Sequence, residues 1–220
     1  MSIAENSDIE NWIAKETPEP ATEPELPIID PHHHLWDLRK NNQMGFRQEV
    51  YLCEEISRDI RDSGHNVVQT VFAQCGAFYR ADGPEEMKCI GETEFVNGIA
   101  AMSRSGLYGS TRLCTGIFST ADLRLGSGVE AVLEAHLQAS SNFRGIRSAF
   151  PSDLNDTFLE GFALLEKYDF ISFNYLFVAD FLERKSILEI AIESNSSNEI
   201  LDKIIEINPD SVMFKGYDYI

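Results

Sequence analysis

Residues 66–75 read Asn66-Val-Val-Gln-Thr-Val-Phe-Ala-Gln-Cys75, a short run rich in β-branched and apolar side chains. Such a run is typical of a strand that is buried on both faces, as the strands of parallel sheets are. An amphipathic stretch over residues 52–61 precedes it and ends at Ser63-Gly64, which predicts a helix. A helix followed by a buried strand indicates an α/β fold built from strand–helix units.

The same alternation continues on both sides of this run. Further apolar runs predict strands over residues 26–30, 111–120, 143–150 and 170–175. Periodic stretches predict helices over about residues 82–103, 129–139, 156–165, 177–192 and 198–207, with a polar loop over 121–128. A final run over 211–220 could form a sixth strand. Five to six strands are fewer than the eight of a closed barrel, which typically takes about 250 residues.

The net charge of the chain limits the classes of partner that it is expected to bind. The 220 residues carry 36 acidic and 18 basic side chains, for a formal net charge of −18. This field repels nucleic acids and anionic membrane surfaces, so we expect neither as a partner. The sequence contains no apolar run of the roughly 18 residues that a membrane span needs and no secretory leader, which predicts a cytoplasmic protein.

The N-terminal 25 residues differ in composition from the rest. They hold seven acids and one base, Lys15, and include the proline-rich stretch Thr17-Pro-Glu-Pro-Ala-Thr-Glu-Pro-Glu25, which predicts a disordered tail. Residues 26–220 then form one predicted domain. Its four cysteines are widely spaced, and we expect them to be reduced and mostly buried.

The stretch Ile28-Ile-Asp-Pro-His-His-His-Leu-Trp-Asp37 suggests a reactive site at the end of the first strand. Because side chains alternate along a strand, His32 and His34 point to one face and His33 points to the other. Two imidazoles on one face can share a divalent ion, with zinc the first choice, and form part of a site that needs about three protein ligands. A surface turn is the plainer reading of a His-x-His pattern on its own.

An apolar strand that ends in Asp-x-His-x-His-Leu-Trp-Asp resembles the opening of the amidohydrolase-related family, in the branch that contains lactonases and decarboxylases. Later stretches resemble further landmarks of this family in the same order: residues 83–101, Gly116–Leu123 and Phe143-Arg-Gly-Ile-Arg147. The match covers about residues 27–168. The resemblance implies a TIM-barrel-like (β/α) fold, here expected to be incomplete or truncated after residue 168.

Arg147 is the candidate substrate ligand. It stands near the carboxyl end of a predicted strand, where barrel active sites are built, and its guanidinium could bind a substrate carboxylate through two hydrogen bonds. A structural ion pair is the competing interpretation. Arg144 alternates to the other face, where we expect a surface role.

The rest of the expected ligand set is hard to find. His65 lies at the wrong end of its strand, and His136 lies near a helix end, where an imidazolium would suit the helix dipole. Cys75, at the end of its strand, could substitute as a ligand, but a buried apolar role is the plainer expectation. The stretch Val212–Asp218 loosely resembles the last strand of the family, whose aspartate would orient or deprotonate the attacking water, but Asp218 most simply faces solvent. The acids at positions 85, 86, 92 and 94 are expected to face water. No nucleotide-binding glycine motif or serine-hydrolase elbow occurs.

Two classes of function remain open. The first is a hydrolase of the amidohydrolase-related family that cleaves a lactone, ester or amide bond of a small carboxylated substrate, with a divalent metal ion at His32 and His34 or, as in some members of this branch, no metal. The second is a catalytically inactive, truncated barrel that acts as a binding or homodimer-forming protein. Decarboxylation of an aromatic acid is a further alternative within the family.

Overall fold

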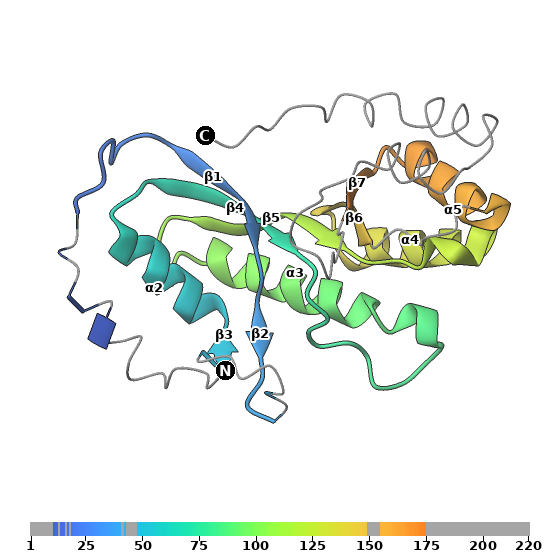
Figure 1. The fold of residues 1–220 in the computed structure, drawn as a ribbon, viewed down its shortest axis with the longest axis horizontal. Helices are drawn as coiled ribbons and strands as arrows, with labels where there is room; N and C mark the ends of the chain where they lie inside the picture. Colours follow the sequence, from blue (N-terminus) through green and yellow to red (C-terminus); the bar gives the residue numbers. More distant parts are fainter. Residues whose placement is uncertain are drawn as a thin grey trace. The chain divides into compact units, whose positions relative to one another are not determined.

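The computed structural model describes residues 11–12, 14–15, 17, 19–40, 42, 48–148 and 155–174. This part of the chain is α/β, as predicted, with a mainly parallel sheet (Figure 1). Along the chain the elements are β1 (Ile28–His33), β2 (Trp36–Asp37), β3 (Val50–Tyr51), α2 (Cys53–Ser63), β4 (Val67–Ala73), η1 (Glu85–Met87), α3 (Ile90–Arg104), β5 (Arg112–Ser119), η2 (Leu123–Val129), α4 (Glu130–Ala139), β6 (Phe143–Ser148), α5 (Asp156–Lys167) and β7 (Ile171–Asn174).

The main sheet has the strand order β1-β4-β5-β6-β7, so its strands follow one another in chain order. All five predicted strands that fall in the described residues are present, with shifted ends. The chain divides into two compact units, the first from residues 1–77 and 98–115 and the second from residues 78–97 and 116–220. Both α3 and β5 contribute residues to each unit.

In the first unit, β1 pairs in parallel with β4. Helix α2 starts next to Leu52, whose backbone N–H donates to Glu55 Oε2 at 2.9 Å, and it ends at Gly64. The φ of Gly64 is 73°, a left-handed conformation that glycine adopts at little cost, which explains why Ser63-Gly64 ends the helix as predicted.

Sequence patterns missed a small hairpin that precedes α2. The antiparallel strands β2 and β3 have two residues each, too few to show the alternation by which strands are recognised. Trp36 stacks on Tyr51 with ring centroids 5.1 Å apart, and its Nε1 donates to the Gln48 carbonyl at 2.7 Å. The hairpin therefore depends on one aromatic pair as well as on its ladder.

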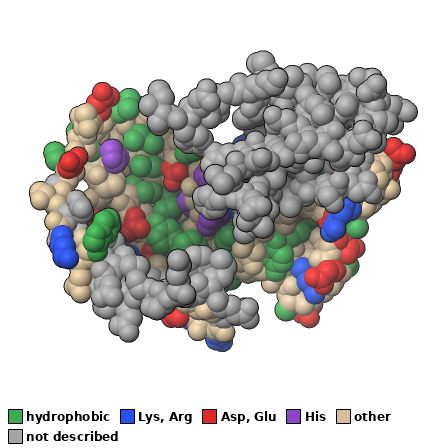
Figure 2. Space-filling view, in the orientation of Figure 1, with side chains coloured by type: hydrophobic (Ala, Val, Ile, Leu, Met, Phe, Trp, Pro, Cys, Tyr) green, Lys and Arg blue, Asp and Glu red, His purple; other side chains and the backbone are tan. Residues whose placement is uncertain are grey.

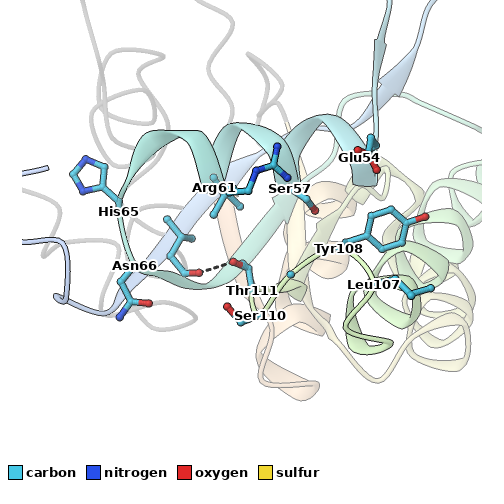
Figure 3. Close-up of a pocket in the computed structure, with 12 residues that line it drawn as sticks. Glu54, Ser57, Arg61, His65, Asn66, Leu107, Tyr108, Ser110 and Thr111 are labelled. Carbon is cyan, nitrogen blue, oxygen red and sulfur yellow. Dashed lines mark hydrogen bonds between the residues drawn. The ribbon is translucent and has the colours of Figure 1, made fainter. Parts of the chain in front are cut away.

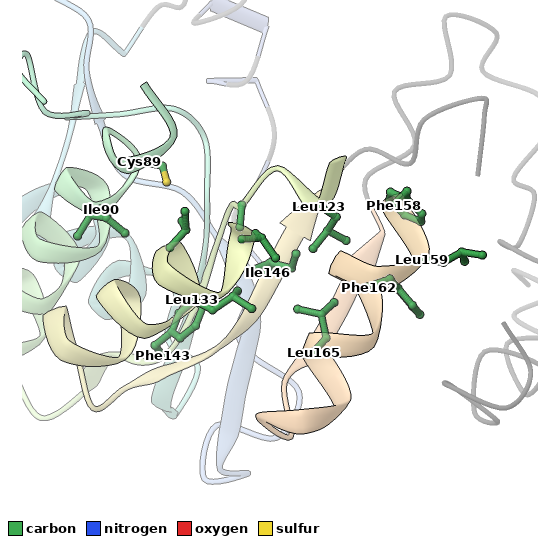
Figure 4. Close-up of a cluster of buried hydrophobic side chains, with 13 residues drawn as sticks. Cys89, Ile90, Leu123, Leu133, Phe143, Ile146, Phe158, Leu159, Phe162 and Leu165 are labelled. Carbon is green, nitrogen blue, oxygen red and sulfur yellow. The ribbon is translucent and has the colours of Figure 1, made fainter. Parts of the chain in front are cut away.

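The second unit is built around a cluster of buried apolar side chains from α3, η2, α4, β6 and α5 (Figure 4). Phe143 and Ile146 of β6 lie in this cluster with Leu133 of α4. Helix α5 is capped by Asn155, whose side chain accepts from the Phe158 N–H at 3.0 Å. The core residues drawn are Cys89, Ile90, Ala121, Leu123, Val129, Val132, Leu133, Phe143, Ile146, Phe158, Leu159, Phe162 and Leu165.

The predicted start of α3 at about residue 82 is wrong. Pro84 instead opens the short 3-10 helix η1, and α3 begins at Ile90. The Lys88 carbonyl accepts from the Arg80 N–H at 2.9 Å, so the preceding chain crosses the helix at this point. Gly91 makes this crossing possible, because a Cβ at that position would lie 2.5 Å from the Phe78 carbonyl oxygen. The predicted loop over 121–128 likewise contains η2, with Leu123 buried.

Several predictions concern residues outside the described part. These are the helices over 177–192 and 198–207, the strand over 211–220 with Asp218, and most of the N-terminal tail. The extent of the single domain predicted over 26–220 stays a prediction for the same reason. Among the described residues, none of the helices combines the length and the apolar character required to span a membrane.

Candidate functional site

The carboxyl end of β1 brings His32 and His34 together, on the face predicted from strand alternation. Their Nε2 atoms lie 3.2 Å apart, and their rings meet edge to face with centroids 4.8 Å apart. His32 is exposed and His34 is half-buried. Histidine side chains are visible on the molecular face shown in Figure 2. The pair is therefore accessible to solvent and to a ligand.

The ring of His34 is oriented by a backbone contact with β4. Its Nδ1 lies 2.7 Å from the carbonyl oxygen of Ala73, the last residue of that strand. A carbonyl oxygen only accepts, so Nδ1 must carry the ring proton, and Nε2 of the neutral ring then has a lone pair. This is the arrangement found in metal-binding histidines, whose second nitrogen commonly donates to a carbonyl or carboxylate.

The histidine pair fits a tetrahedral metal ion. With metal–nitrogen distances of about 2.0–2.1 Å, two nitrogens 3.2 Å apart subtend an angle of about 100–105° at the ion, close to the tetrahedral value. Imidazole nitrogen is a ligand that zinc accepts. Among the residues with assigned positions, no group of three or more His, Cys, Asp or Glu side chains is placed to hold a metal ion. The described part of the chain thus brings together two potential ligands, fewer than the roughly three protein ligands that a catalytic site needs.

The backbone around the pair leaves the regular ladder. Asp30 pairs with Thr70 and His33 with Phe72, so three steps along β1 oppose two steps along β4. Pro31 has no N–H, and the N–H of His32 donates to Asp30 Oδ1 at 3.0 Å instead of to a strand. Side-chain contacts therefore add to an irregular ladder in this segment.

His33 is the buried anchor of this segment. Its exposed fraction is 8%, and its Nε2 lies 2.8 Å from Thr70 Oγ1. Burial lowers the pKa of His33 to about 4, although Asp30 acts in the opposite direction, so the ring is neutral at pH 7. Thr70 is fully buried and also accepts from the Cys114 N–H at 3.0 Å. The Thr70 hydroxyl thus joins β1 to β5.

Arg147 lies in β6, within the second unit, and pairs with Phe173 of β7. Its exposed fraction is 8%. A buried guanidinium has to be matched by polar groups, which both a substrate carboxylate and a structural ion pair would provide. Arg144 is exposed, as expected, and its Nη1 donates to the carbonyls of Ser141 and Phe143 at 2.8 Å.

The expectation that His136 is a charged helix-end residue is wrong. The side chain is fully buried in α4, and burial lowers its pKa to about 4. Its Nε2 donates to the Thr120 carbonyl at 3.0 Å, and its Nδ1 lies 2.9 Å from Thr93 Oγ1. His136 is therefore a neutral core residue of the second unit.

The expectation that Cys75 has a buried apolar role is wrong. All four cysteines are free thiols, and Cys53, Cys89 and Cys114 are buried, but Cys75 is exposed. Its Sγ donates to the Leu35 carbonyl at 3.4 Å, next to His34 in the chain. The chain turns to the surface directly after β4, at Gln74, so the thiol falls beyond the buried part of the strand.

Glu92 also departs from its expected place. It is fully buried in the first turn of α3, whereas Glu85, Glu86 and Glu94 are exposed as predicted. The helix starts later than predicted, and its inward face includes positions 90 and 93 together with 92. The expectation was wrong because it rested on the rule that charged side chains on a helix usually face water.

A separate surface pocket lies at the amino-terminal end of β4, with a volume of about 300 Å³ (Figure 3). Glu54, Ser57 and Arg61 of α2 form one wall, and Leu107 and Tyr108 form part of the other. His65 lines it too, as expected for a residue at the end of β4 opposite to that of the histidine pair. None of the residues predicted to bind metal or substrate lies in this pocket.

Two contributors to the site escaped sequence reasoning. The Ala73 carbonyl is a backbone group and carries no residue-type signal. Thr70 looks like any β-branched strand residue, because threonine is common in strands for packing reasons. The only available signal was its position in a run that directly follows β1 in the predicted sheet.

Comparison of the chain with protein-family models, with curated proteins and with solved structures finds no match. Membership of the amidohydrolase-related family therefore stays a prediction from the sequence motifs.

Proposed function

We propose that the chain is a hydrolase of the amidohydrolase-related type that cleaves a lactone, ester or amide bond of a small carboxylated substrate. The observation that carries this proposal is the convergence of His32 Nε2 and His34 Nε2 to 3.2 Å, with His34 Nδ1 bonded to the Ala73 carbonyl. In this arrangement both rings present nitrogen to one point at the carboxyl end of a parallel strand. Zinc is the first candidate for the ion they would hold.

The residues of the chain and a bound ion would have the following roles in the reaction. A bound divalent ion would polarise the substrate carbonyl and acidify a water molecule. His32 and His34 would bind it as neutral ligands, and the Ala73 carbonyl would keep His34 in the tautomer that leaves Nε2 free to ligate. Arg147 would hold the substrate carboxylate through two parallel hydrogen bonds.

The finer fold class belongs to the same proposal. We infer an incomplete (β/α) barrel, because β1, β4, β5, β6 and β7 neighbour one another in chain order and are joined by helices. Sequential parallel strands with helical crossovers are how such barrels are built. A cytoplasmic location is also part of the proposal, and the free state of all four cysteines agrees with a reducing compartment.

The activity is tested with a panel of carboxylated lactones, esters and amides and the zinc-repleted full-length protein. We expect turnover of at least one compound, and we expect Arg147→Lys to raise KM, because lysine keeps the charge but not the planar pair of donors. Arg144→Lys is the matched control, since Arg144 is exposed and donates only to nearby carbonyls among the contacts described above.

The other outcomes separate the alternatives. Release of carbon dioxide from an aromatic acid would replace hydrolysis by decarboxylation. A folded protein that binds zinc but turns over no member of the panel would support the inactive, binding form of the barrel. An Arg147→Lys variant with the KM of the Arg144→Lys variant would remove Arg147 from the substrate site.

A further inference from the structure

We propose that Thr70 is a positioning residue for the His32/His34 pair and that it acts through His33. The inference rests on the proposed function, because it concerns the metal-binding geometry of the same pair. Thr70 is 37 residues away from His33 in the chain and touches neither His32 nor His34 in the contacts described above. Its role would be to hold the backbone from which both ligands project.

The first step is that the ladder that supports the β1 segment carrying the histidines is irregular. The pairing of β1 with β4 shifts register between Asp30 and His33. Pro31 cannot donate, and the His32 N–H is taken by Asp30 Oδ1. The position of the two ligands therefore depends on side-chain contacts as well as on the ladder pair of His33 with Phe72.

The second step is that His33 provides the buried contact. It sits between the two ligands in the chain and points to the opposite face, where Nε2 meets Thr70 Oγ1 at 2.8 Å. Fixing this ring fixes the peptide groups on both of its sides. Adjacent side chains on a strand point to opposite faces. The buried contact of His33 with Thr70 therefore directs His32 and His34 together to the other, exposed face.

The third step is that Thr70 is itself held by a strained strand. Cys114 of β5 has a φ of 55°, a left-handed conformation that is uncommon for residues other than glycine. Its backbone N–H donates to Thr70 Oγ1 at 3.0 Å. Such conformations persist where surrounding contacts determine them, and they cluster at functional sites. Cys114, Thr70 and His33 thus form one buried connection from the centre of the sheet to the histidine pair.

The hydroxyl of Thr70 is essential to this connection. It accepts from Cys114 and keeps a hydrogen and a second lone pair, so it can bond His33 Nε2 in either tautomer of the ring. Valine has nearly the same shape as threonine, but its side chain can neither donate nor accept a hydrogen bond. Thr70→Val therefore removes both bonds while filling the same volume, and Thr70→Ser keeps the hydroxyl.

The experiment measures the affinity of the full-length protein for Co²⁺ and Zn²⁺ alone, by calorimetry and by the visible spectrum of bound Co²⁺. The variants are Thr70→Val, Thr70→Ser and, as a matched control, Thr111→Val, which removes a hydroxyl that donates to the Val67 carbonyl at 2.7 Å near the other end of the strands. Thermal unfolding of each variant confirms that it is folded.

We expect Thr70→Val to weaken metal binding by about tenfold or more, as loss of supporting contacts around metal ligands commonly does, and to change the Co²⁺ spectrum. Thr70→Ser should restore the affinity and Thr111→Val should leave it unchanged. A folded Thr70→Val protein with wild-type affinity and spectrum would overturn the role of Thr70. A wild-type protein that binds neither ion would instead remove the proposed metal-dependent function, and this inference with it.

A second measurement applies if Thr70→Val does not fold. In the wild-type protein, Zn²⁺ addition should shift the amide resonance of Cys114, whose N–H bonds to Thr70, and leave that of Thr111 in place. An unshifted Cys114 resonance at saturating Zn²⁺ would contradict a mechanical link between the ligands and this connection.

Discussion

The Nδ1 atom of His34 lies 2.7 Å from the carbonyl oxygen of Ala73, across the pairing of β1 with β4. This contact decides which nitrogen of His34 is available to a ligand. Since His34 Nε2 then has no proton, the 3.2 Å contact with His32 Nε2 needs a proton from His32 in the metal-free protein. The two rings should therefore adopt opposite tautomers without metal.

This tautomer assignment is the first prediction. Two-bond ¹H–¹⁵N spectra of the histidine side chains should show His34 protonated at Nδ1 and His32 protonated at Nε2 above the pH at which both rings are neutral. Zn²⁺ should abolish the Nε2 proton of His32, because both Nε2 atoms then become ligands. Observation of His34 protonated at Nε2 would show that the Ala73 contact does not orient the ring.

The buried His136 should make the free energy of unfolding depend on pH. Its pKa falls from 6.5 to about 4 on folding, so the unfolded chain binds a proton in this range and the folded protein does not. Stability is therefore complete above pH 6.5 and declines as the pH falls towards 4, by on the order of 3 kcal/mol for this residue.

Chemical unfolding between pH 7 and 4.5 measures this effect in the wild type and in His136→Gln, which cannot titrate. The variant is less stable at pH 7 because it loses core contacts, but its stability should fall less steeply as the pH is lowered. His65→Gln is the control for the loss of an exposed histidine. Equal slopes in all three proteins would mean that His136 is protonated in the folded state.

Packing between α5 and η2 should make Gly161 intolerant of a side chain. A Cβ at this position would lie 2.3 Å from the Leu123 carbonyl oxygen, so the backbone of one element would have to move. We expect Gly161→Ala to destabilise the protein by about 1–3 kcal/mol, as overpacking of a tight contact does.

Gly98→Ala is the matched control for this substitution. Gly98 also lies in a helix, α3, but nothing approaches its Cβ position within 4 Å. Alanine has the higher helix propensity, so this variant should be more stable than the wild type by up to about 1 kcal/mol. Urea unfolding of both variants tests the pair, and equal effects at the two positions would contradict the close approach at Gly161.

The four cysteines should differ sharply in reactivity. Cys75 is exposed, while the other three are buried. Burial raises the pKa of Cys89 to about 11 and raises the pKa of Cys53 and Cys114 as well. Because the thiolate is the reacting form, brief treatment of the native protein with iodoacetamide at pH 7.5 should label Cys75 alone. Mass spectrometry that finds a second cysteine labelled equally fast would contradict this burial.

Long apolar runs with clear periodicity allowed most of the fold to be predicted. The run that became β4 and the capped helix α5 are examples, since burial and capping act over short stretches of chain. The two-residue strands of the hairpin and the late start of α3 escaped prediction. In α3 the decisive contact is the close approach of Phe78 to Gly91, which lies outside any local pattern.

The candidate site was predictable to a similar extent. Strand alternation placed His32 and His34 on one face, because this property depends on the local backbone alone. The connection through His33, Thr70 and Cys114 depends on residues 37 to 81 positions apart and on a left-handed residue inside a strand. Neither is visible in a single sequence. The buried position of Glu92 was missed because charged side chains on a helix usually face water.

The most direct test of the central claim is the divalent metal content of the purified, zinc-repleted protein beside that of a His32→Ala/His34→Ala double variant. His65→Ala serves as the control for loss of an exposed histidine. We predict near-stoichiometric zinc in the wild type and in His65→Ala and its loss from the double variant, with all three proteins folded. A folded wild type without zinc, or a double variant that keeps it, would contradict a metal centre at His32 and His34.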